Sequence, residues 1–398
     1  MVQPSTGERK TLITNGSDPR YLPTGHLLYA RGGTLFVVPF DLKRLTVTGN
    51  GMPVLEGVAR AILGRSSTGA TQADVSANGS IVYAPGPASP ASEPPRLVIV
   101  DRAGNVTPVK VQPGFYERPR VSPDGGQLAI ASEDSTGATI WIHDLSGDTS
   151  MRPLTFQGQG RNLFPVWSAD GTYVAFQSDR DGAPAIFRQR SDGSSIAERL
   201  TTPDKESAHV PESWSSDGKH LLYSVSKAAT NTIWAYSLES KKGVQIPDVE
   251  TPIRPSPSFS PDGQWIAYTT STAGGQNQVF AQPFPPTGAK YRIGAGTRPL
   301  WSRSGKEIFY YRGDGGTLFK TVIATRPGLT LSNETALPFN VLLGRGPGGF
   351  GRDADIMPDD KRFVAVVVPS GASGAAGIRR FDVITNWFEE LKQRVPMN

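Results

Sequence analysis

Four histidines are the side chains of this sequence that best suit acid–base chemistry or metal binding. His26, His143, His209 and His220 are spread along the chain, and no two stand at the i, i+4 spacing that places both rings on one helix face. The chain contains no cysteine, which excludes disulfides, thiolate metal sites and thiol catalysis. We therefore expect strand or loop histidines, no metal centre and no cofactor.

Three other segments imitate known sites. Residues 344–349 match Gly-x-Gly-x-x-Gly, but Pro347 and its polar surroundings offer no strand-to-helix turn that would hold a dinucleotide. Residues 64–69 have the wrong spacing for the Gly-x-Ser-x-Gly elbow of serine hydrolases. Asp179 and Asp181 stand close together and could contribute to a Ca²⁺ site, although such a site needs six to eight oxygen ligands. A tight turn explains the same residues, so calcium binding stays an open alternative.

The charged residues indicate a mildly basic surface without a basic patch. Lys and Arg number 41 against 36 Asp and Glu, a net charge of +5, and the basic residues occur singly. This distribution predicts no nucleic-acid partner. Residues 1–10 lack an apolar signal segment, and the most apolar later stretch, Phe363 to Val368, is far shorter than the roughly 18 residues of a membrane span. We expect a monomer with no targeting signal and no membrane insertion of this chain.

The elements that carry these residues follow from composition and from an internal repeat. With 44 Gly and 34 Pro, the chain turns too often for a helical bundle. Five segments share an apolar residue, a serine, two turn positions and a glycine, and three weaker copies flank them. The anchor positions of the eight copies are residues 25, 79, 125, 171, 218, 263, 305 and 360. Their spacing of 42 to 55 residues has room for four short strands in each unit.

Each position of the unit has a structural interpretation. The residue four before each anchor is always apolar, which predicts a core position: Tyr21, Val75, Val121, Trp167, Trp214, Phe259, Trp301 and Ile356. We therefore interpret the tryptophans in this series as packing residues and not as stacking platforms for ligands. Aspartates occupy equivalent turn positions in four of the units, and we expect them to have a structural role in each turn: Asp124, Asp170, Asp217 and Asp262. Strands that are apolar on both faces indicate sheets packed between neighbours, as the blades of a propeller are.

The repeats predict an all-β fold, a single closed β-propeller of four-stranded antiparallel blades over residues 1–398. We expect eight blades, with seven as the alternative. The last unit supplies strands near Asp355, Phe363 to Val368 and Ile378 to Ile384, and the orphan segment Arg9 to Thr14 is expected to close that blade. Residues 386–398 are expected to form a C-terminal tail.

The units resemble a known family. Ser-Pro-Asp-Gly turns and the continuation Ser178-Asp179-Arg180-Asp181-Gly182 are similar to the WD-repeat-like propeller repeats of the TolB family, over nearly the whole chain. The segments at residues 20–30 and 33–41 and the terminal Asn386-Trp387-Phe388-Glu389-Glu390-Leu391 resemble the C-terminal propeller region of bacterial receptor-like serine/threonine kinases. That resemblance implies a periplasmic or extracellular sensor module of a larger receptor. The kinase motifs His-Arg-Asp, Asp-Phe-Gly and Val-Ala-Ile-Lys are missing, so only the propeller carries over.

Charged residues gather just before the core positions, where the innermost strands of a propeller line its channel. They predict a charged channel mouth that binds a protein, a peptide or a small polar ligand: Arg20, Asp74, Arg118, Arg120, Arg161, His209, Arg254, Arg298, Asp353 and Asp355, with Asp18 beside them. The competing interpretation is that these Asp and Arg residues pair across blade boundaries and only satisfy one another.

We therefore expect a non-catalytic binding or sensing propeller and no enzyme activity. The alternative is a propeller enzyme, a hydrolase or metal-assisted lyase, with its site in the channel mouth. A purely structural scaffold is a third hypothesis, which saturable binding of a ligand would exclude.

Overall fold

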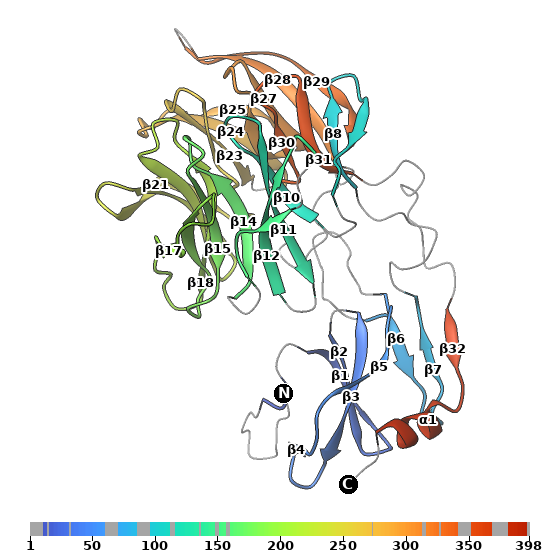
Figure 1. Cartoon of the computed structure of the whole chain (residues 1–398). Coiled ribbons are helices and arrows are strands. Elements are labelled where there is room, and N and C mark those ends of the chain that lie inside the picture. Colours follow the sequence, from blue (N-terminus) through green and yellow to red (C-terminus); the bar gives the residue numbers. More distant parts are fainter. Residues whose placement is uncertain are drawn as a thin grey trace. The chain divides into compact units, whose positions relative to one another are not determined.

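The structure is a computed structural model with two compact units (Figure 1). It describes residues 11–13, 16–31, 33–59, 71–85, 96–111, 116–134, 137–147, 151–156, 160–272, 274–312, 316–325, 328–340, 352–367 and 381–395. The propeller unit comprises Pro95–Gly344 and Phe350–Val368, and the small unit comprises Met1–Pro94, Arg345–Gly349 and Pro369–Asn398. The sequence predicts one domain over residues 1–398, whereas the contacts divide the chain in two.

The propeller unit contains six four-stranded antiparallel sheets among its described residues. Sheet 1 is β10 (Tyr116–Val121), β11 (Gln127–Asp134), β12 (Gly137–Asp144) and β13 (Arg152–Pro153). Sheet 2 is β14 (Asn162–Trp167), β15 (Tyr173–Ser178), β16 (Ala185–Arg190) and β17 (Glu198–Arg199). Sheet 3 is β18 (Ser207–Trp214), β19 (His220–Lys227), β20 (Thr230–Ser237) and β21 (Lys242–Thr251).

The remaining three sheets of the propeller unit follow in chain order. In the last of them, the two outer strands come from an earlier part of the chain. Sheet 4 is β22 (Ser258–Phe259), β23 (Trp265–Ser271), β24 (Asn277–Pro283) and β25 (Tyr291–Ala295). Sheet 5 is β26 (Thr297–Trp301), β27 (Glu307–Arg312), β28 (Thr317–Ala324) and β29 (Thr330–Asn340). Sheet 6 is β30 (Ala354–Ile356), β31 (Arg362–Val367), β8 (Arg96–Asp101) and β9 (Val106–Pro108).

Six apolar core clusters join each sheet to the next and sheet 6 back to sheet 1. Ile140 of sheet 1 and Phe176 of sheet 2, for example, belong to one cluster. Val364 of sheet 6 and Leu128 of sheet 1 belong to the one that completes the ring. Each sheet buries both faces, as the apolar pattern predicts, because a neighbouring sheet packs on each side.

The closing strand differs from the sequence prediction. The strand expected at Arg9 to Thr14 lies mostly outside the described residues, and residues 11–13 are not in a strand. The free edge of β31 is instead taken by β8, in an unbroken register from Arg362 opposite Asp101 to Val367 opposite Arg96. Both strands are apolar over most of their length, so their pairing buries more apolar surface than a short polar N-terminal strand would. The ring is still closed by an earlier segment of the chain, but by one about 90 residues further along.

Two of the eight predicted units do not become four-stranded blades, and both lie in the small unit. One of its sheets has the order β1 (Ser17–Leu22), β2 (His26–Arg31), β3 (Thr34–Asp41) and β4 (Thr46–Val47), with β5 (Met52–Leu55) also on β3. The other has the order β32 (Asp382–Ile384), β7 (Ile81–Tyr83) and β6 (Ala73–Val75). The predicted core residue Tyr21 is 47% exposed here, whereas its six counterparts in the propeller unit are buried.

The expected C-terminal tail contains a helix, α1 (Trp387–Arg394). Trp387 and Leu391 are one turn apart and buried in the core of the small unit. The backbone N–H of Trp387 donates to the carbonyl of Gly79, and the buried His26 ring contacts the carbonyl of Val395 through Nε2 at 2.8 Å. This segment is therefore part of the folded core of the small unit.

The repeated turns have the structure that the sequence predicts. In sheet 2, Ser168 Oγ donates to Asp170 Oδ1 at 2.6 Å, and the backbone N–H of Tyr173 donates to Ser168 Oγ at 2.9 Å. Gly171 has φ 72°, a left-handed conformation that favours glycine. The same serine–aspartate bond occurs at Asp124, Asp217 and Asp262. The aspartates therefore stabilise turns, as expected from their repetition.

Candidate functional site

One residue on or just before each inner strand stands three before the core residue, and in β10, β14, β18 and β26 the pairing register is interrupted by a bulge near this position. These residues are Arg118, Phe164, Pro211, Ser256, Arg298 and Asp353. Four of them have a left-handed backbone, with φ between 46° and 57°: Arg118, Phe164, Ser256 and Arg298. Such a conformation costs about 1–3 kcal/mol in a non-glycine residue and is concentrated at functional sites. The fold thus brings a repeated, strained position from successive strands to the inside of the ring.

Phe164 is the centre of this arrangement. The guanidinium carbons of Arg118 and Arg254 lie 4.1 and 4.0 Å from the centroid of its ring. Both distances are within the range of a cation–π contact, which strengthens when the partners are shielded from water. Arg118 is 1% exposed, and Phe164 is 5% exposed. We call Arg118, Arg254 and Arg298, together with Phe164, the arginine cluster.

Two glutamates lie beside the arginine cluster. Arg254 Nε donates to Glu212 Oε1 at 2.7 Å, and Ser224 Oγ donates to the same oxygen at 2.7 Å. Arg118 Nη1 lies 2.7 Å from Glu117 Oε2, close enough for an ion pair. Within the described part of the chain, Arg118 Nε and Nη1 and Glu117 Oε2 have no hydrogen-bond partner, so this ion pair is the contact shown for Nη1. Burial raises the pKa of Glu117, which the charge of Arg118 opposes.

Asp353 and Asp355, at the inner strand of sheet 6, accept hydrogen bonds from the backbone of β10, the inner strand of sheet 1. The Arg118 N–H donates to Asp353 Oδ1 at 3.2 Å, and the Val121 N–H donates to Asp355 Oδ2 at 2.9 Å. Burial lowers the pKa of Arg298, and the charge of Asp353 opposes that shift. These carboxylates join sheet 6 to sheet 1 as well as balancing arginine charge.

Arg352 precedes the inner strand of sheet 6 and reaches across the inside of the ring to sheets 3 and 5. Its Nη1 donates to the carbonyl of Pro299 at 2.8 Å, and its Nη2 donates to the carbonyl of Glu212 at 2.7 Å. Its own carbonyl accepts a bond of 2.9 Å from Arg120 Nη1. Burial lowers the pKa of Arg352 to about 10. A single side chain therefore links sheets 3, 5 and 6 across the ring.

The structure brings together six of the ten residues predicted for the channel mouth. Contacts or electrostatic coupling join these six into one group: Arg118, Arg120, Arg254, Arg298, Asp353 and Asp355. Some of them pair across sheet boundaries, as the competing interpretation expects. Arg118 is the exception, because its buried guanidinium keeps two nitrogens without hydrogen-bond partners in the described structure.

The other four predicted residues have their direct contacts elsewhere, although Arg161 is coupled electrostatically to Glu117 beside the cluster. Arg20 and Asp74 form an ion pair with each other in the small unit, where Asp18 accepts a hydrogen bond from the backbone of Thr71. Arg161 donates from Nη2 to Glu133 Oε1 at 2.5 Å. His209 packs against Tyr223 with ring centroids 5.3 Å apart, and burial lowers its pKa to about 4.

Four residues of the site were not predicted from the sequence: Glu117, Phe164, Glu212 and Arg352. Phe164 occupies the same place before its core residue as Arg118 and Arg298, so its register was a usable signal. Glu212 lies two residues before Trp214, in the strand that also contains the predicted site residue His209, and the repeat does not single out its position. Nothing in the sequence indicates that Arg352 reaches across the ring.

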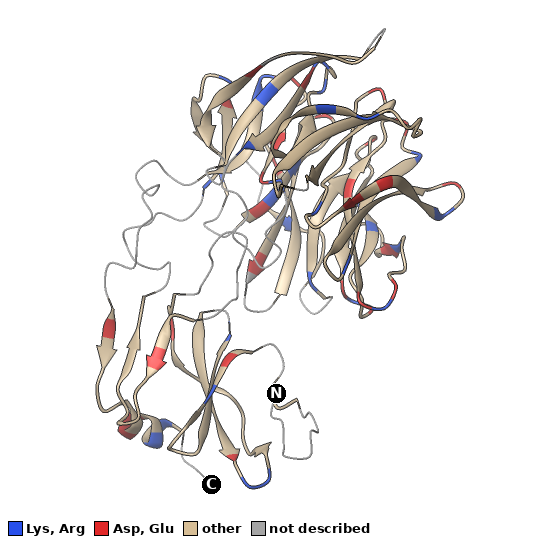
Figure 2. Cartoon of the chain, turned by 180° about the vertical axis from the view of Figure 1, so that it is seen from behind, with Lys and Arg blue, Asp and Glu red and all other residues tan. Residues whose placement is uncertain are grey.

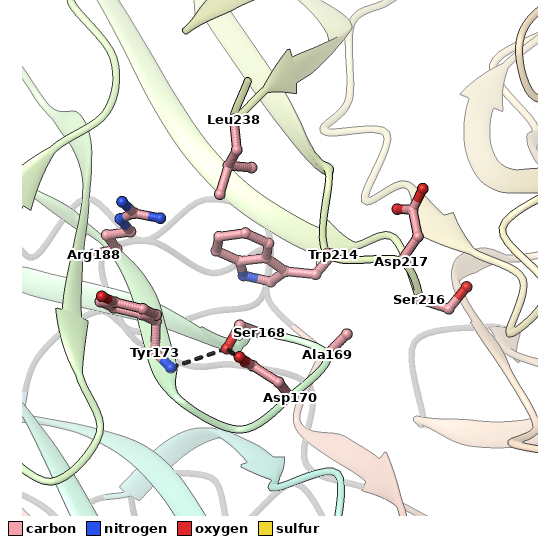
Figure 3. A pocket seen from close by; sticks show the side chains of 10 residues that line it. Ser168, Ala169, Asp170, Tyr173, Arg188, Trp214, Ser216, Asp217 and Leu238 are labelled. Carbon is pink, nitrogen blue, oxygen red and sulfur yellow. Dashed lines mark hydrogen bonds between the residues drawn. The ribbon is translucent and has the colours of Figure 1, made fainter. Parts of the chain in front are cut away.

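Apart from the arginine cluster, a hollow with a volume of about 400 Å³ lies at the turns of sheets 2 and 3 (Figure 3). Its lining consists of turn residues and a few larger side chains: Ser168, Ala169, Asp170, Tyr173, Arg188, Trp214, Ser216, Asp217, Gly218 and Leu238. Asp170 and Asp217 each bond the serine two residues earlier, which lowers their pKa. Arg188 lies over the ring of Tyr173 and pairs with Glu198. The polar groups of this hollow are thus largely engaged with one another.

The other predicted motifs add no chemistry within the described residues. Residues 64–69 and 344–349 lie outside them. Asp179 accepts a hydrogen bond from the Arg161 N–H at 2.6 Å, and Asp181 pairs with Arg199 at 3.5 Å, so both carboxylates have partners in the protein. The turn between them is closed by the Gly182 N–H, which donates to the carbonyl of Asp179 at 2.9 Å. No group of three or more His, Asp or Glu with metal-binding geometry occurs in the part of the chain that was searched. Basic and acidic residues are interspersed along the ribbon of the propeller unit (Figure 2).

The one helix among the described residues has eight residues, and no described helix has the length and apolar character needed to cross a membrane.

Comparison with known proteins supports the propeller. Residues 88–241 match the family model described as PD40, TolB beta propeller domain. The uncharacterized peptidase YuxL of Bacillus subtilis is 26% identical over a match that covers 38% of this chain and 29% of that protein. The uncharacterized protein Atu1656 of Agrobacterium fabrum is 36% identical, with coverage of 20% and 26%. The Tol-Pal system protein TolB of Wolinella succinogenes is 25% identical, with coverage of 37% and 35%.

These matches span between a quarter and about a third of the length of the curated relatives. Among solved structures, the putative TolB from Agrobacterium tumefaciens is similar with a TM-score of 0.55 and 21% sequence identity. That similarity covers 69% of this chain and 99% of the other. Together with the six-sheet ring, these findings show a β-propeller fold, in which residues 88–241 match the TolB propeller family model.

Proposed function

We propose that the propeller unit is a non-catalytic binding module that holds a protein segment, a peptide or a small polar ligand at the arginine cluster. One observation carries the proposal. Arg118 is a fully buried cation whose Nε and Nη1 have no hydrogen-bond partner within the described residues. A buried polar group left unsatisfied costs roughly 1–3 kcal/mol, and more when it is charged. A ligand that supplied the missing acceptors would recover that free energy.

The surroundings of Arg118 support the same proposal. Arg254 and Arg298 are partly exposed and lie in the same electrostatic environment. Both stand on inner strands or just before them, and they are more exposed than the buried guanidinium of Arg118. The Arg352 guanidinium donates to two carbonyls, and a purely structural role would give the Arg118 guanidinium a comparable set of partners.

A ligand screen with a matched variant tests the proposal. The whole chain is incubated with short peptides and small polar compounds, and the melting temperature is measured for the natural protein, Arg298→Gln and Arg190→Gln. Arg190 is the control because it is exposed and pairs with Asp192 in its own turn. We expect at least one compound to stabilise the natural protein and Arg190→Gln but not Arg298→Gln. Equal responses in all three proteins, or none, would contradict a site at the arginine cluster.

An enzyme with its site in the channel mouth is the competing function. The relative named as an uncharacterized peptidase motivates it, although the match covers only 29% of that protein. Mass spectrometry of each stabilising compound after prolonged incubation separates the two functions. An unchanged compound supports a binding module, and a product whose formation Arg298→Gln abolishes supports an enzyme.

We also propose that the propeller serves as the sensor part of a bacterial envelope signalling protein, facing the periplasm or the cell exterior. The resemblance of residues 20–30, 33–41 and 386–391 to receptor-like kinases supports this role. An immunoblot and intact mass measurement in the source cell test it. A membrane-enriched species well above 42.6 kDa supports the sensor, and a freestanding species at 42.6 kDa contradicts it.

A further inference from the structure

The balance of charge in the arginine cluster and its immediate partners indicates what kind of ligand would fit. Five arginines meet there: Arg118, Arg120, Arg254, Arg298 and Arg352. Four carboxylates face them: Glu117, Glu212, Asp353 and Asp355. Glu133 also interacts electrostatically with Arg118 and pairs with Arg161. With this pair included, six arginines minus five carboxylates leave one positive charge in a largely buried space. Burial also raises the pKa of Glu117, which favours its neutral form and adds to the excess.

Three of the four carboxylates also accept hydrogen bonds from groups other than arginine side chains. Asp353 Oδ1 accepts the backbone N–H of Arg118, and Asp355 accepts those of Val121 and Ile356. Glu212 Oε1 is shared between Arg254 and Ser224. The carboxylates therefore leave Arg118 Nε without an acceptor, and the contact shown for Arg118 Nη1 in the described structure is its ion pair with Glu117 Oε2 at 2.7 Å.

The geometry of Arg118 favours a planar acceptor. Its guanidinium is fixed by the Phe164 ring at 4.1 Å, so the plane of its N–H donors is held in place. A guanidinium presents donors in a fork that matches the two oxygens of a carboxylate. Arg254, held by the same ring at 4.0 Å, adds a second positive charge nearby. An uncharged polar ligand could accept hydrogen bonds but would leave the excess charge in place.

We infer, on the basis of the proposed binding function, that the ligand carries a carboxylate and that Arg118 receives this group with Arg254 and Arg298 around it. The carboxylate enters past Arg298, which is partly exposed, and reaches Arg118, which is 1% exposed. Its source is either the C-terminus of a peptide or a small free acid. The recognising chemistry is the same in both cases.

Succinate and its uncharged analogue succinamide test the inference with the whole chain. Both are titrated at constant ionic strength while tryptophan fluorescence is followed. Trp167 is a suitable reporter because its Nε1 donates to the carbonyl of Arg120 at 2.8 Å, next to the cluster. We expect a saturable change with succinate and none with succinamide. A tripeptide as free acid and as C-terminal amide forms the second arm, and a preference for its free acid over succinate identifies a peptide C-terminus as the source.

Two variants locate the binding. Arg298→Gln removes a charge from the partly exposed side, and we expect its affinity for succinate to fall about tenfold or more. Arg118→Lys keeps the charge and removes the fork, so it should still prefer succinate to succinamide but bind succinate more weakly than the natural protein does. If this variant does not fold, the Arg298 variant decides. Arg190→Gln should bind as the natural protein does. Equal binding of charged and amide forms would overturn the inference while the binding function stands, and a ligand screen with no binder at all would overturn both.

Discussion

The Nη2 atom of Arg352 lies 2.7 Å from the carbonyl oxygen of Glu212, on the opposite side of the ring of sheets. Arg352 leads into sheet 6 and Glu212 belongs to sheet 3, three sheets away in either direction. The same guanidinium also donates to the carbonyl of Pro299 in sheet 5. Propeller sheets are mainly held by contacts between neighbours, whereas this side chain also connects sheet 6 with sheet 3, and these two sheets share no core cluster among the described residues.

Replacing Arg352 with alanine should destabilise the propeller unit by about 2–4 kcal/mol, because two buried carbonyls lose their donors. Urea unfolding followed by tryptophan fluorescence measures this change, since six of the seven tryptophans lie in the propeller unit. The control is Arg362→Ala, whose partner Asp359 lies in an exposed pair and whose loss should cost less than about 1 kcal/mol. Equal effects of the two variants would show that the link across the ring adds no stability.

Two equivalent tryptophans differ in their hydrogen bonds. Trp167 Nε1 donates to the carbonyl of Arg120 at 2.8 Å, whereas Trp214 Nε1 is buried without a partner in the described structure. The two side chains are similarly buried, at 7% and 8% exposed. Trp167→Phe should therefore cost about 1 kcal/mol more than Trp214→Phe, which loses similar packing but no bond. Denaturant unfolding of both variants gives the difference, and a reversed order would contradict the assigned bond.

The fold was largely predictable because packing and turns leave a repeating signal. Val121, Trp167 and Trp301 are core residues in the places that the repeat predicts. The number of blades was not predictable in this way. Tyr21 carries the same sequence signal but is half exposed, because its strand belongs to a different sheet in the small unit. The repeat records local turn chemistry, and it does not record which sheet a strand joins.

The candidate site was predictable only where it follows the repeat. Arg118 and Arg298 stand at a fixed distance from a core residue, and the structure brings them into one electrostatic group. Arg20 stands directly before Tyr21, as Arg120 stands before Val121, but it lies in the small unit, where it pairs with Asp74. Arg352 could not be placed, because a long side chain that crosses the ring has no periodic signal. Side-chain reach and sheet membership are properties of the assembled fold.

Removing a turn aspartate should lower stability without affecting ligand binding. Asp262 accepts Ser260 Oγ at 2.5 Å and the Gln264 N–H at 3.1 Å, and both bonds are lost in Asp262→Ala. We expect a loss of about 1–2 kcal/mol from the two local bonds. Asp204→Ala is the control, because the Asp204 side chain is 81% exposed and pairs weakly with Lys227 at 3.7 Å. A change in affinity for succinate in Asp262→Ala at unchanged stability would contradict the structural role of these aspartates.

His209 should make the stability of the propeller unit depend on pH below neutrality. Burial lowers its pKa from 6.5 to about 4, so the unfolded chain binds a proton more readily than the folded chain. The contribution of the neutral ring is fully present above pH 6.5 and is lost as the pH falls toward 4. At about 1.4 kcal/mol per pH unit, the loss has an upper limit of about 3 kcal/mol.

Urea unfolding at pH 7.5, 6.0 and 5.0 measures this effect in the natural protein and in His209→Gln. The variant should be less stable at pH 7.5 and lose less stability on acidification, because glutamine does not titrate. His143, whose pKa is also lowered by burial, stays in both proteins and accounts for the part of the slope that remains. Parallel pH profiles for the two proteins would show that His209 is protonated as easily in the folded chain as in the unfolded one.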